Sequence, residues 1–148
     1  MLRRFTTDES GLTLIEILIV ILILGVLASQ IAPRVMNAPD KAKVATAQSH
    51  IKALQSALDM YSLNVGDYPT TDQGLEALWK APTPTPANWE PTVKSPNFTD
   101  PWGRAYIYAY PGAHEGYDYD LYSLGKDGKV GGDPPFDADI TNWIEETE

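Results

Sequence analysis

The chain has 148 residues, which is enough for a single modest hydrophobic core. Its 20 Asp and Glu outnumber its 11 Lys and Arg, giving a formal net charge of −9 and an isoelectric point near 4.5. This acidity argues against nucleic-acid binding, because a phosphate backbone attracts clustered Lys and Arg. The absence of cysteine excludes disulfides, thiolate nucleophiles and Cys-ligated metal sites, and two histidines are too few for a His-rich metal site.

Residues 12–32 form an apolar run with a single charged residue, Glu16. As a helix this run is about 31 Å long, which matches the hydrocarbon thickness of a bilayer. Arg3 and Arg4 precede it, and positive flanking residues favour the cytoplasmic side of a membrane. The pattern therefore predicts one transmembrane helix with a cytoplasmic N-terminus and the rest of the chain outside.

Three interpretations of this helix compete. A cleaved secretory signal has a shorter apolar stretch and an Ala-x-Ala-like site, which residues 28–30 (ASQ) match poorly. A plain anchor fits the length but leaves Glu16 unexplained, because a lone carboxylate in hydrocarbon costs several kcal/mol unless it is protonated or paired. Length and charge alone leave a plain anchor and a more specialised helix open.

Residues 11–16 (GLTLIE), followed by the unbroken apolar run, resemble the N-terminal signature of type IV pilins and pseudopilins. The resemblance implies that a prepilin peptidase cuts between Gly11 and Leu12, removes the leader at residues 1–11, and methylates the new N-terminus at Leu12. It also implies that Glu16 meets the N-terminal ammonium of a neighbouring subunit during assembly. Two charges that are each costly in an apolar bundle become tolerable as a pair.

Pro33 follows the apolar run and predicts a break or kink in the helix, and Pro39 predicts a second interruption. From residue 41 the apolar residues follow 3-4-3-4-3 spacing, which predicts an amphipathic helix ending at Gly66. We expect its apolar stripe to be core, and His50 beside it to lie at the surface or the boundary. The stripe consists of Val44, Ala47, Ile51, Leu54, Leu58 and Tyr61.

Residues 67–148 predict a small α+β region. A short helix is expected within residues 71–80, with Leu75, Leu78 and Trp79 as its inner face. The Pro- and Thr-rich loop that follows, residues 81–100, is long enough to need packing by its own aromatic side chains, Trp89 and Phe98.

Two strands are predicted at residues 104–110 and 117–122, joined by a turn at 111–116. Residues 139–144 predict a third strand or a closing segment, with Ile140 and Trp143 directed inward. The expected fold class is therefore α+β, with a long N-terminal helix packed on a small antiparallel sheet.

Aspartates and glycines alternate near the C-terminus. Like charges held in one loop repel, so the arrangement needs solvent or a cation. Ligands that are all oxygen suit Ca²⁺ and are wrong for zinc or copper, but the EF-hand spacing is absent. Composition alone leaves a calcium site and a solvated acidic loop open. The residues are Asp127, Asp133, Asp137 and Asp139, with Gly125, Gly128, Gly131 and Gly132.

Four further stretches resemble the major pseudopilins of type II secretion systems: residues 68–75 (YPTTDQGL), 100–103 (DPWG), 122–128 (YSLGKDG) and 137–143 (DADITNW). Together with the N-terminal motif, the likeness spans nearly the whole chain. It implies a type IV pilin-like α+β fold whose C-terminal loop, residues 124–139, binds calcium.

The resemblance also implies a ligand set for this ion. It consists of the Leu124 carbonyl, the Asp127 carboxylate, a carbonyl at Lys129 or Val130, and the Asp137 carboxylate. Two further aspartates, Asp133 and Asp139, are candidates. The stretch at residues 133–136 (DPPF) departs from the family's Gly-rich polar stretch, which changes the ligand spacing on the side of Asp133. If Asp139 faces a strand, its side chain would cap the loop instead of binding the ion.

The domain organisation follows from these assignments: a leader at residues 1–11, a transmembrane and filament-core helix at 12–32, a periplasmic helix at 33–66 and a globular region at 67–148. The implied function is the major structural subunit of a periplasmic filament, the pseudopilus, in a Gram-negative bacterium. The filament starts at the inner membrane and helps export folded proteins across the outer membrane.

The implied partners are copies of the same chain, minor pseudopilins, the inner-membrane assembly platform, the prepilin peptidase and, indirectly, the outer-membrane secretin. Two close alternatives are a type IV major pilin, which forms surface fibres, and a minor tip pseudopilin. The third is a membrane-anchored enzyme using Ser123, His114 and Asp120, but no Gly-x-Ser-x-Gly elbow is present. We therefore expect no catalytic residues.

Overall fold

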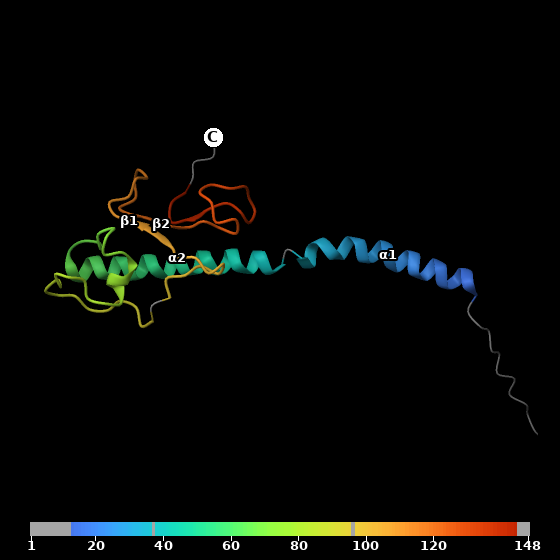
Figure 1. Ribbon diagram of the computed structural model, residues 1–148, viewed down its shortest axis with the longest axis horizontal. Helices are drawn as coiled ribbons and strands as arrows, with labels where there is room; N and C mark the ends of the chain where they lie inside the picture. Colours follow the sequence, from blue (N-terminus) through green and yellow to red (C-terminus); the bar gives the residue numbers. More distant parts are fainter. Residues whose placement is uncertain (1–12, 37, 96, 145–148) are drawn as a thin grey trace, which may run out of the picture. The chain divides into compact units, whose positions relative to one another are not determined.

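The computed structural model describes residues 13–36, 38–95 and 97–144 (Figure 1). The predictions for the leader, for Gly11 and for Leu12 lie outside the described residues. The chain divides into two compact units, Met1–Ala38 and Pro39–Glu148, and each is described by itself.

The first unit contains helix α1, Leu14–Met36. Thr13 caps it, because its Oγ1 accepts a hydrogen bond of 3.3 Å from the backbone N–H of Glu16. The side chains described run to Ser29, and every large apolar one among them is at least 44% exposed. Within the described residues, no helix reaches the combination of length and hydropathy that marks a membrane span.

Helix α1 continues through Pro33 to Met36, where the sequence predicted a break or a kink, so the helix is not broken there. A proline removes only one backbone donor, so a long helix can continue past it. Helix α2, Ala38–Val65, has Pro39 in its first turn. The first-turn N–H groups have no partner within a helix, so Pro39 opens α2 at little cost.

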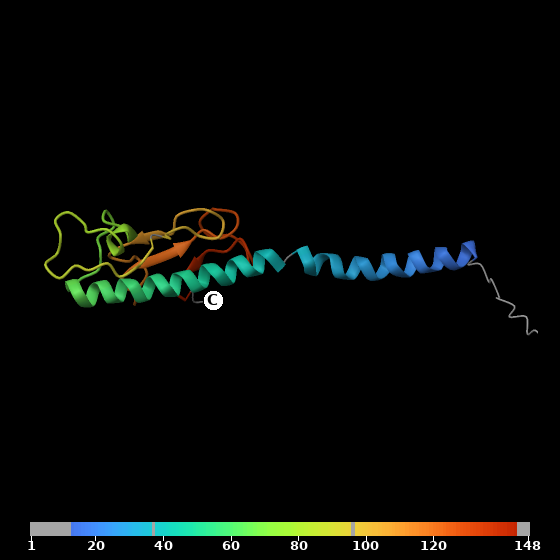
Figure 2. The same cartoon turned by 90° about the horizontal axis from the view of Figure 1, so that it is seen from below.

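The core of the second unit is built on one face of α2. Five of the six predicted stripe residues are buried, and the sixth, Val44, is half-buried against the same core. The prediction of the stripe is confirmed, and Ala57 joins it. His50 is half-buried at the edge of this face, as expected. Figure 2 shows the sheet and its loops along one side of α2.

The segment after α2 is a turn followed by a short 3-10 helix, η1, Leu75–Leu78. Thr70 and Gln73 cap the turn reciprocally: each backbone N–H donates to the other's side-chain oxygen, at 2.9 and 3.3 Å. Leu75, Ala77 and Leu78 are buried. The prediction for Trp79 was wrong, since this side chain is 44% exposed. A 3-10 helix has three residues per turn, so its buried face differs from that of the α-helix assumed.

The sheet has three antiparallel strands in the order β1-β2-β3. They are β1, Ile107–Ala109, β2, Asp120–Ser123, and β3, Ile140–Thr141. β1 and β3 lie inside their predicted segments, β2 runs one residue past the end of its segment, and all three are shorter than predicted. The register pairs Tyr108 with Leu121 and Ser123 with Ile140.

The loop between η1 and β1 is packed down by its aromatic residues, as predicted. The Trp89 indole N–H donates a 2.8 Å hydrogen bond to the Ala77 carbonyl, and Phe98 packs against the core. The backbone N–H of Thr92 donates to the Leu78 carbonyl at 2.9 Å. These contacts attach a long irregular segment to η1.

Candidate functional site

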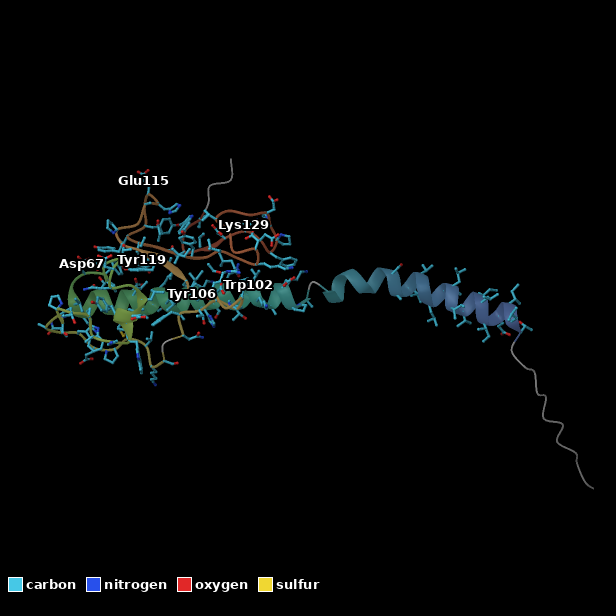
Figure 3. All side chains as sticks on the ribbon, in the orientation of Figure 1. Asp67, Trp102, Tyr106, Glu115, Tyr119 and Lys129 are labelled. Atoms are coloured by element: carbon cyan, nitrogen blue, oxygen red, sulfur yellow. The ribbon has the colours of Figure 1, made fainter. Side chains whose placement is uncertain are left out.

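The segment between β2 and β3 contains every predicted calcium ligand. Leu124, Asp137 and Asp139 are half-buried, whereas Asp127 and Asp133 are exposed. Lys129, labelled in Figure 3, and Val130 are also exposed. Across the described residues, no group of three or more His, Cys, Asp or Glu side chains is arranged to hold a metal ion. Calcium binding therefore stays a prediction.

The loop is closed by its own backbone. The Leu124 carbonyl accepts a 3.2 Å hydrogen bond from the Gly128 N–H, which makes residues 124–128 a tight turn. The Asp127 carboxylate accepts the N–H of Lys129 at 3.0 Å. The far side of the loop is joined by Asp139, whose carboxylate accepts the Gly131 N–H at 2.9 Å. Two predicted carboxylates thus have backbone partners inside the loop.

Backbone oxygens gather where the two halves of the loop meet. Gly125 has φ of +60°, and a Cβ built on it would lie 2.6–3.1 Å from the carbonyl oxygens of Phe136, Asp137 and Ala138. Only glycine leaves room for this approach and adopts this backbone angle freely. A set of donors made entirely of oxygen fits a hard cation such as Ca²⁺. The predicted ligands included Asp137 as a carboxylate but no carbonyl from residues 136–138, because this approach depends on the folded loop.

A buried aspartate, Asp100, supports the same loop through Ser123 and Arg104. Asp100 is 5% exposed and accepts hydrogen bonds from the Ser123 hydroxyl at 2.7 Å and from the backbone N–H groups of Trp102 and Arg104 at 3.0 and 2.8 Å. Arg104 donates in turn from Nη2 to the Gly125 carbonyl. The sequence placed residues 100–103 in a motif but assigned neither Asp100 nor Arg104 a role.

A lysine in the loop reaches α2. Lys126 Nζ lies 2.8 Å from Asp40 Oδ2 and 5.9 Å from the ring centre of Phe136. The hydrogen bond from Lys126 to the Asp40 carboxylate raises the pKa of the lysine, because the partner stabilises its charged form.

The residues considered for a serine-type triad do not form one. The Ser123 hydroxyl donates to Asp100, whereas Asp120 pairs with His114, whose Nδ1 lies 3.0 Å from Oδ1 of that carboxylate. The His114 ring stacks on Trp143, with ring centres 3.7 Å apart. The arrangement therefore holds the turn before β2 against the segment after β3.

Hydrogen bonds also tune the acidity of Asp120. Burial raises the pKa of its carboxyl, but the backbone N–H of Ala113 and the side chain and N–H of His114 together outweigh burial and lower it. Asp120 is therefore held as a carboxylate, which suits a structural acceptor.

Tyrosines fill the other end of the sheet. Tyr68 packs between Tyr110 and Tyr119, with ring centres 5.6 and 4.9 Å away, and burial raises the pKa of Tyr119. The Tyr110 hydroxyl donates a hydrogen bond to the Asp67 carboxylate. Figure 3 labels Asp67 and Tyr119 in this group. A raised pKa keeps a tyrosine protonated, so these residues pack through their rings and can donate hydrogen bonds from their hydroxyls.

Residues 34–143 match the family described as Type II secretion system, protein G, and residues 7–29 match the Prokaryotic N-terminal methylation motif. The chain is 53% identical over 141 residues to the Type II secretion system core protein G of Pseudomonas aeruginosa, covering 92% of this chain and 96% of that protein. It is 47% identical over 144 residues to the protein of the same description from Escherichia coli, covering 95% and 94%.

A solved structure also resembles this one. It is the crystal structure of the major pseudopilin from the type 2 secretion system of enterohaemorrhagic Escherichia coli, with a TM-score of 0.58 and 40% sequence identity. The match covers 73% of this chain and 92% of that chain.

Proposed function

The chain belongs to the type II secretion system protein G family, and we propose that it polymerises as the major subunit of the pseudopilus. It is a structural subunit and not an enzyme. The relatives are secretion-system proteins and the similar structure is a major pseudopilin, which favours this function over that of a type IV major pilin. The match to the family over residues 34–143 is the observation that carries the proposal.

The N-terminus is proposed to be processed before assembly. A prepilin peptidase cuts after Gly11 and methylates Leu12, and the match to the methylation motif over residues 7–29 supports both steps. Glu16 then pairs with the methylated ammonium of a neighbouring subunit. Its place in the first turn of α1 supports this role, because cleavage puts the new N-terminus one helical turn away.

The family is anchored in the membrane and forms a periplasmic filament in bacteria. We assign this chain to the inner membrane of a Gram-negative bacterium, with its N-terminus in the cytoplasm before cleavage. The exposed apolar side chains of α1 support this, because a surface of that kind is stable in lipid or in a bundle of like helices and costly in water.

Assembly requires partners beyond the chain itself. We propose that the subunit polymerises with its own copies, joins minor pseudopilins, and is added from the inner-membrane platform after the prepilin peptidase has acted. The outer-membrane secretin is reached indirectly, as the channel through which folded proteins leave.

Calcium is proposed to be bound by the 124–139 loop. The Leu124 carbonyl, the Asp127 and Asp137 carboxylates and a carbonyl at Lys129 or Val130 would hold it, with Asp133 and Asp139 as further candidates. The ion would neutralise carboxylates that otherwise repel one another. The carbonyl oxygens of Asp137 and Ala138 near Gly125 support the proposal, since Ca²⁺ binds oxygen donors, whereas the third, of Phe136, accepts the Lys126 N–H at 3.0 Å.

A deletion of the gene for this chain in its host bacterium tests the proposed function. Secretion and surface piliation are measured in the same strain. Loss of secretion with normal piliation is expected, restored by the wild-type chain. Loss of surface fibres with normal secretion would contradict it and favour a pilin.

Complementation with Glu16→Ala tests assembly. This variant is expected to be cut to the mature mass and yet to form no filament, whereas Glu76→Ala, an exposed acid on η1, behaves as wild type. Normal filaments from Glu16→Ala would contradict the pairing role, and an uncut leader in a host with the peptidase would contradict the processing proposal.

A further inference from the structure

Arg104 is fixed in place at both of its backbone groups. Its N–H donates to Oδ1 of Asp100 at 2.8 Å, and its carbonyl accepts the Asp100 N–H at 2.7 Å. Asp100 is itself buried, and Gly103 with φ of +86° makes the tight turn between the two residues. A residue held in this way has little freedom in its Cα–Cβ direction, so its side chain is aimed by the turn.

The guanidinium that leaves this turn lies under residues 124–128. Nη2 donates to the Gly125 carbonyl. A Cβ on Gly128 would lie 2.9, 3.0 and 3.2 Å from Nη1, Cζ and Nε of the same group. Gly128 therefore faces the flat guanidinium directly, and a side chain at this position would displace it. Gly125 and Gly128, which both belong to the 124–128 turn, therefore lie against the same planar guanidinium.

These contacts belong to a closed network of polar interactions that includes both the carbonyl and the N–H of Gly125. Its carbonyl accepts from Arg104, and its N–H donates to the Ser123 hydroxyl at 3.3 Å. That hydroxyl donates to Oδ2 of Asp100, and the same oxygen lies 3.9 Å from Nε of Arg104. A buried acid thus anchors the turn through a hydroxyl on one side and a guanidinium on the other.

We propose that Arg104 is the positioning residue of the 124–128 turn, and that its guanidinium holds the turn in the shape needed for a cation before any cation binds. The link to cation binding rests on the proposed function of the loop. Through the Gly125 carbonyl, Arg104 acts on the backbone that presents the Leu124 carbonyl and the Asp127 carboxylate.

The effect on calcium follows from populations. When a site is formed in only a fraction of molecules, its apparent Kd equals the intrinsic Kd divided by that fraction, so loosening the turn weakens binding without removing a ligand. Residues that support metal ligands typically change affinity by about 10–100-fold when replaced. Lysine cannot substitute fully, because it lacks the planar fork that spans the Gly125 carbonyl and the open face of Gly128.

Hydrogen–deuterium exchange on the processed full-length chain in detergent micelles tests the proposal. Wild type is compared with Arg104→Ala and Arg104→Lys, and with Lys94→Gln as a control that removes one exposed positive charge elsewhere. All four are measured first with a calcium chelator. The reporters are the amides of Gly125, Lys126 and Gly128, with amides of α2 as the internal reference.

With chelator present, Arg104→Ala is expected to speed exchange of the reporter amides at least tenfold while the α2 amides stay protected. Arg104→Lys is expected to fall between wild type and Arg104→Ala, and Lys94→Gln to match wild type. Reporter amides that exchange in Arg104→Ala as they do in wild type would overturn the proposal. If Arg104→Ala loses protection in α2 as well, Arg104→Lys decides: unchanged reporters there overturn the proposal too.

Titration with CaCl₂ in the same samples separates this inference from the calcium proposal. Arg104→Ala is expected to weaken calcium binding by about 10–100-fold relative to wild type. Equal affinities would overturn the link between the turn and the ion. If wild type itself binds no calcium, the calcium proposal fails, and the exchange measured with chelator still decides whether Arg104 positions the turn.

Discussion

Lys126 in the C-terminal loop lies 2.8 Å from Asp40 in the first turn of α2, although the two residues are 86 positions apart. The carboxylate also sits where a helix favours negative charge, because the first-turn N–H groups point toward it. The pair therefore ties the loop to the start of α2.

The first prediction concerns this ion pair. Asp40→Asn and Lys126→Gln should each loosen the loop slightly, and the double variant should lose no more than either single one, because both remove the same contact. The effect should be small and should shrink as salt rises, since the lysine is exposed. Exchange of the Lys126 amide at low and high salt measures it. Additive losses in the double variant would show that the two charges act separately.

The second prediction concerns the core. Leu58 is fully buried in the face of α2 that meets the sheet, so Leu58→Ala removes apolar contacts and leaves a cavity. The expected loss in free energy of unfolding is about 2–5 kcal/mol. Chemical denaturation of the processed chain measures it. Leu63→Ala is the matched control, because Leu63 is 84% exposed and its truncation should cost little. Equal losses in both variants would contradict the burial of Leu58.

The elements that sequence predicted well are those governed by a local pattern. The stripe on α2 follows helical spacing, and a buried stripe needs no knowledge of what it packs against. The strands were placed because alternating residues flank Gly- and Pro-rich turns. Their shortness was not predictable, since strand ends depend on which partner remains in register.

The features that sequence missed depend on contacts between distant residues. Trp79 was expected inside because an α-helix was assumed where the chain forms a 3-10 turn. In the sequence, Arg104 is only the first residue of a predicted strand. Its role follows from the fold, which brings Gly125 and Gly128 against its guanidinium. The resemblance supplied the predicted calcium ligands, whereas the three carbonyls facing Gly125 became visible only in three dimensions.

The third prediction concerns calcium. Because an ion that binds only the folded state stabilises it, CaCl₂ at 100 times Kd should add about 2.7 kcal/mol to the free energy of unfolding, and a chelator should remove it. Asp127→Asn and Asp137→Asn should each reduce the gain, because each removes a charged ligand. Thermal unfolding with and without calcium measures it. Asp72→Asn, an exposed acid outside the loop, should keep the full gain. Identical melting temperatures with calcium and with chelator would exclude the site.

The last prediction concerns acid stability and Asp120. Hydrogen bonds from Ala113 and His114 lower its pKa below the ordinary value of 3.8, so folding favours the carboxylate. The resulting stability is complete above pH 3.8, where the unfolded chain is also ionised, and is lost as pH falls through the lower folded value. Asp120→Asn should therefore lower stability at pH 6 and flatten its decline below pH 4.

Denaturation of wild type, Asp120→Asn and Asp118→Asn across pH 2–6 measures this. Asp118 is the neighbouring acid and is exposed, so its variant should keep the wild-type slope. The stacked ring of His114 on Trp143 supplies a second readout, because losing the Asp120 carboxylate should free the ring and change Trp143 fluorescence. A wild-type slope below pH 4 in Asp120→Asn would mean that other carboxylates carry the acid sensitivity, and that the His114–Asp120 contact adds nothing to it.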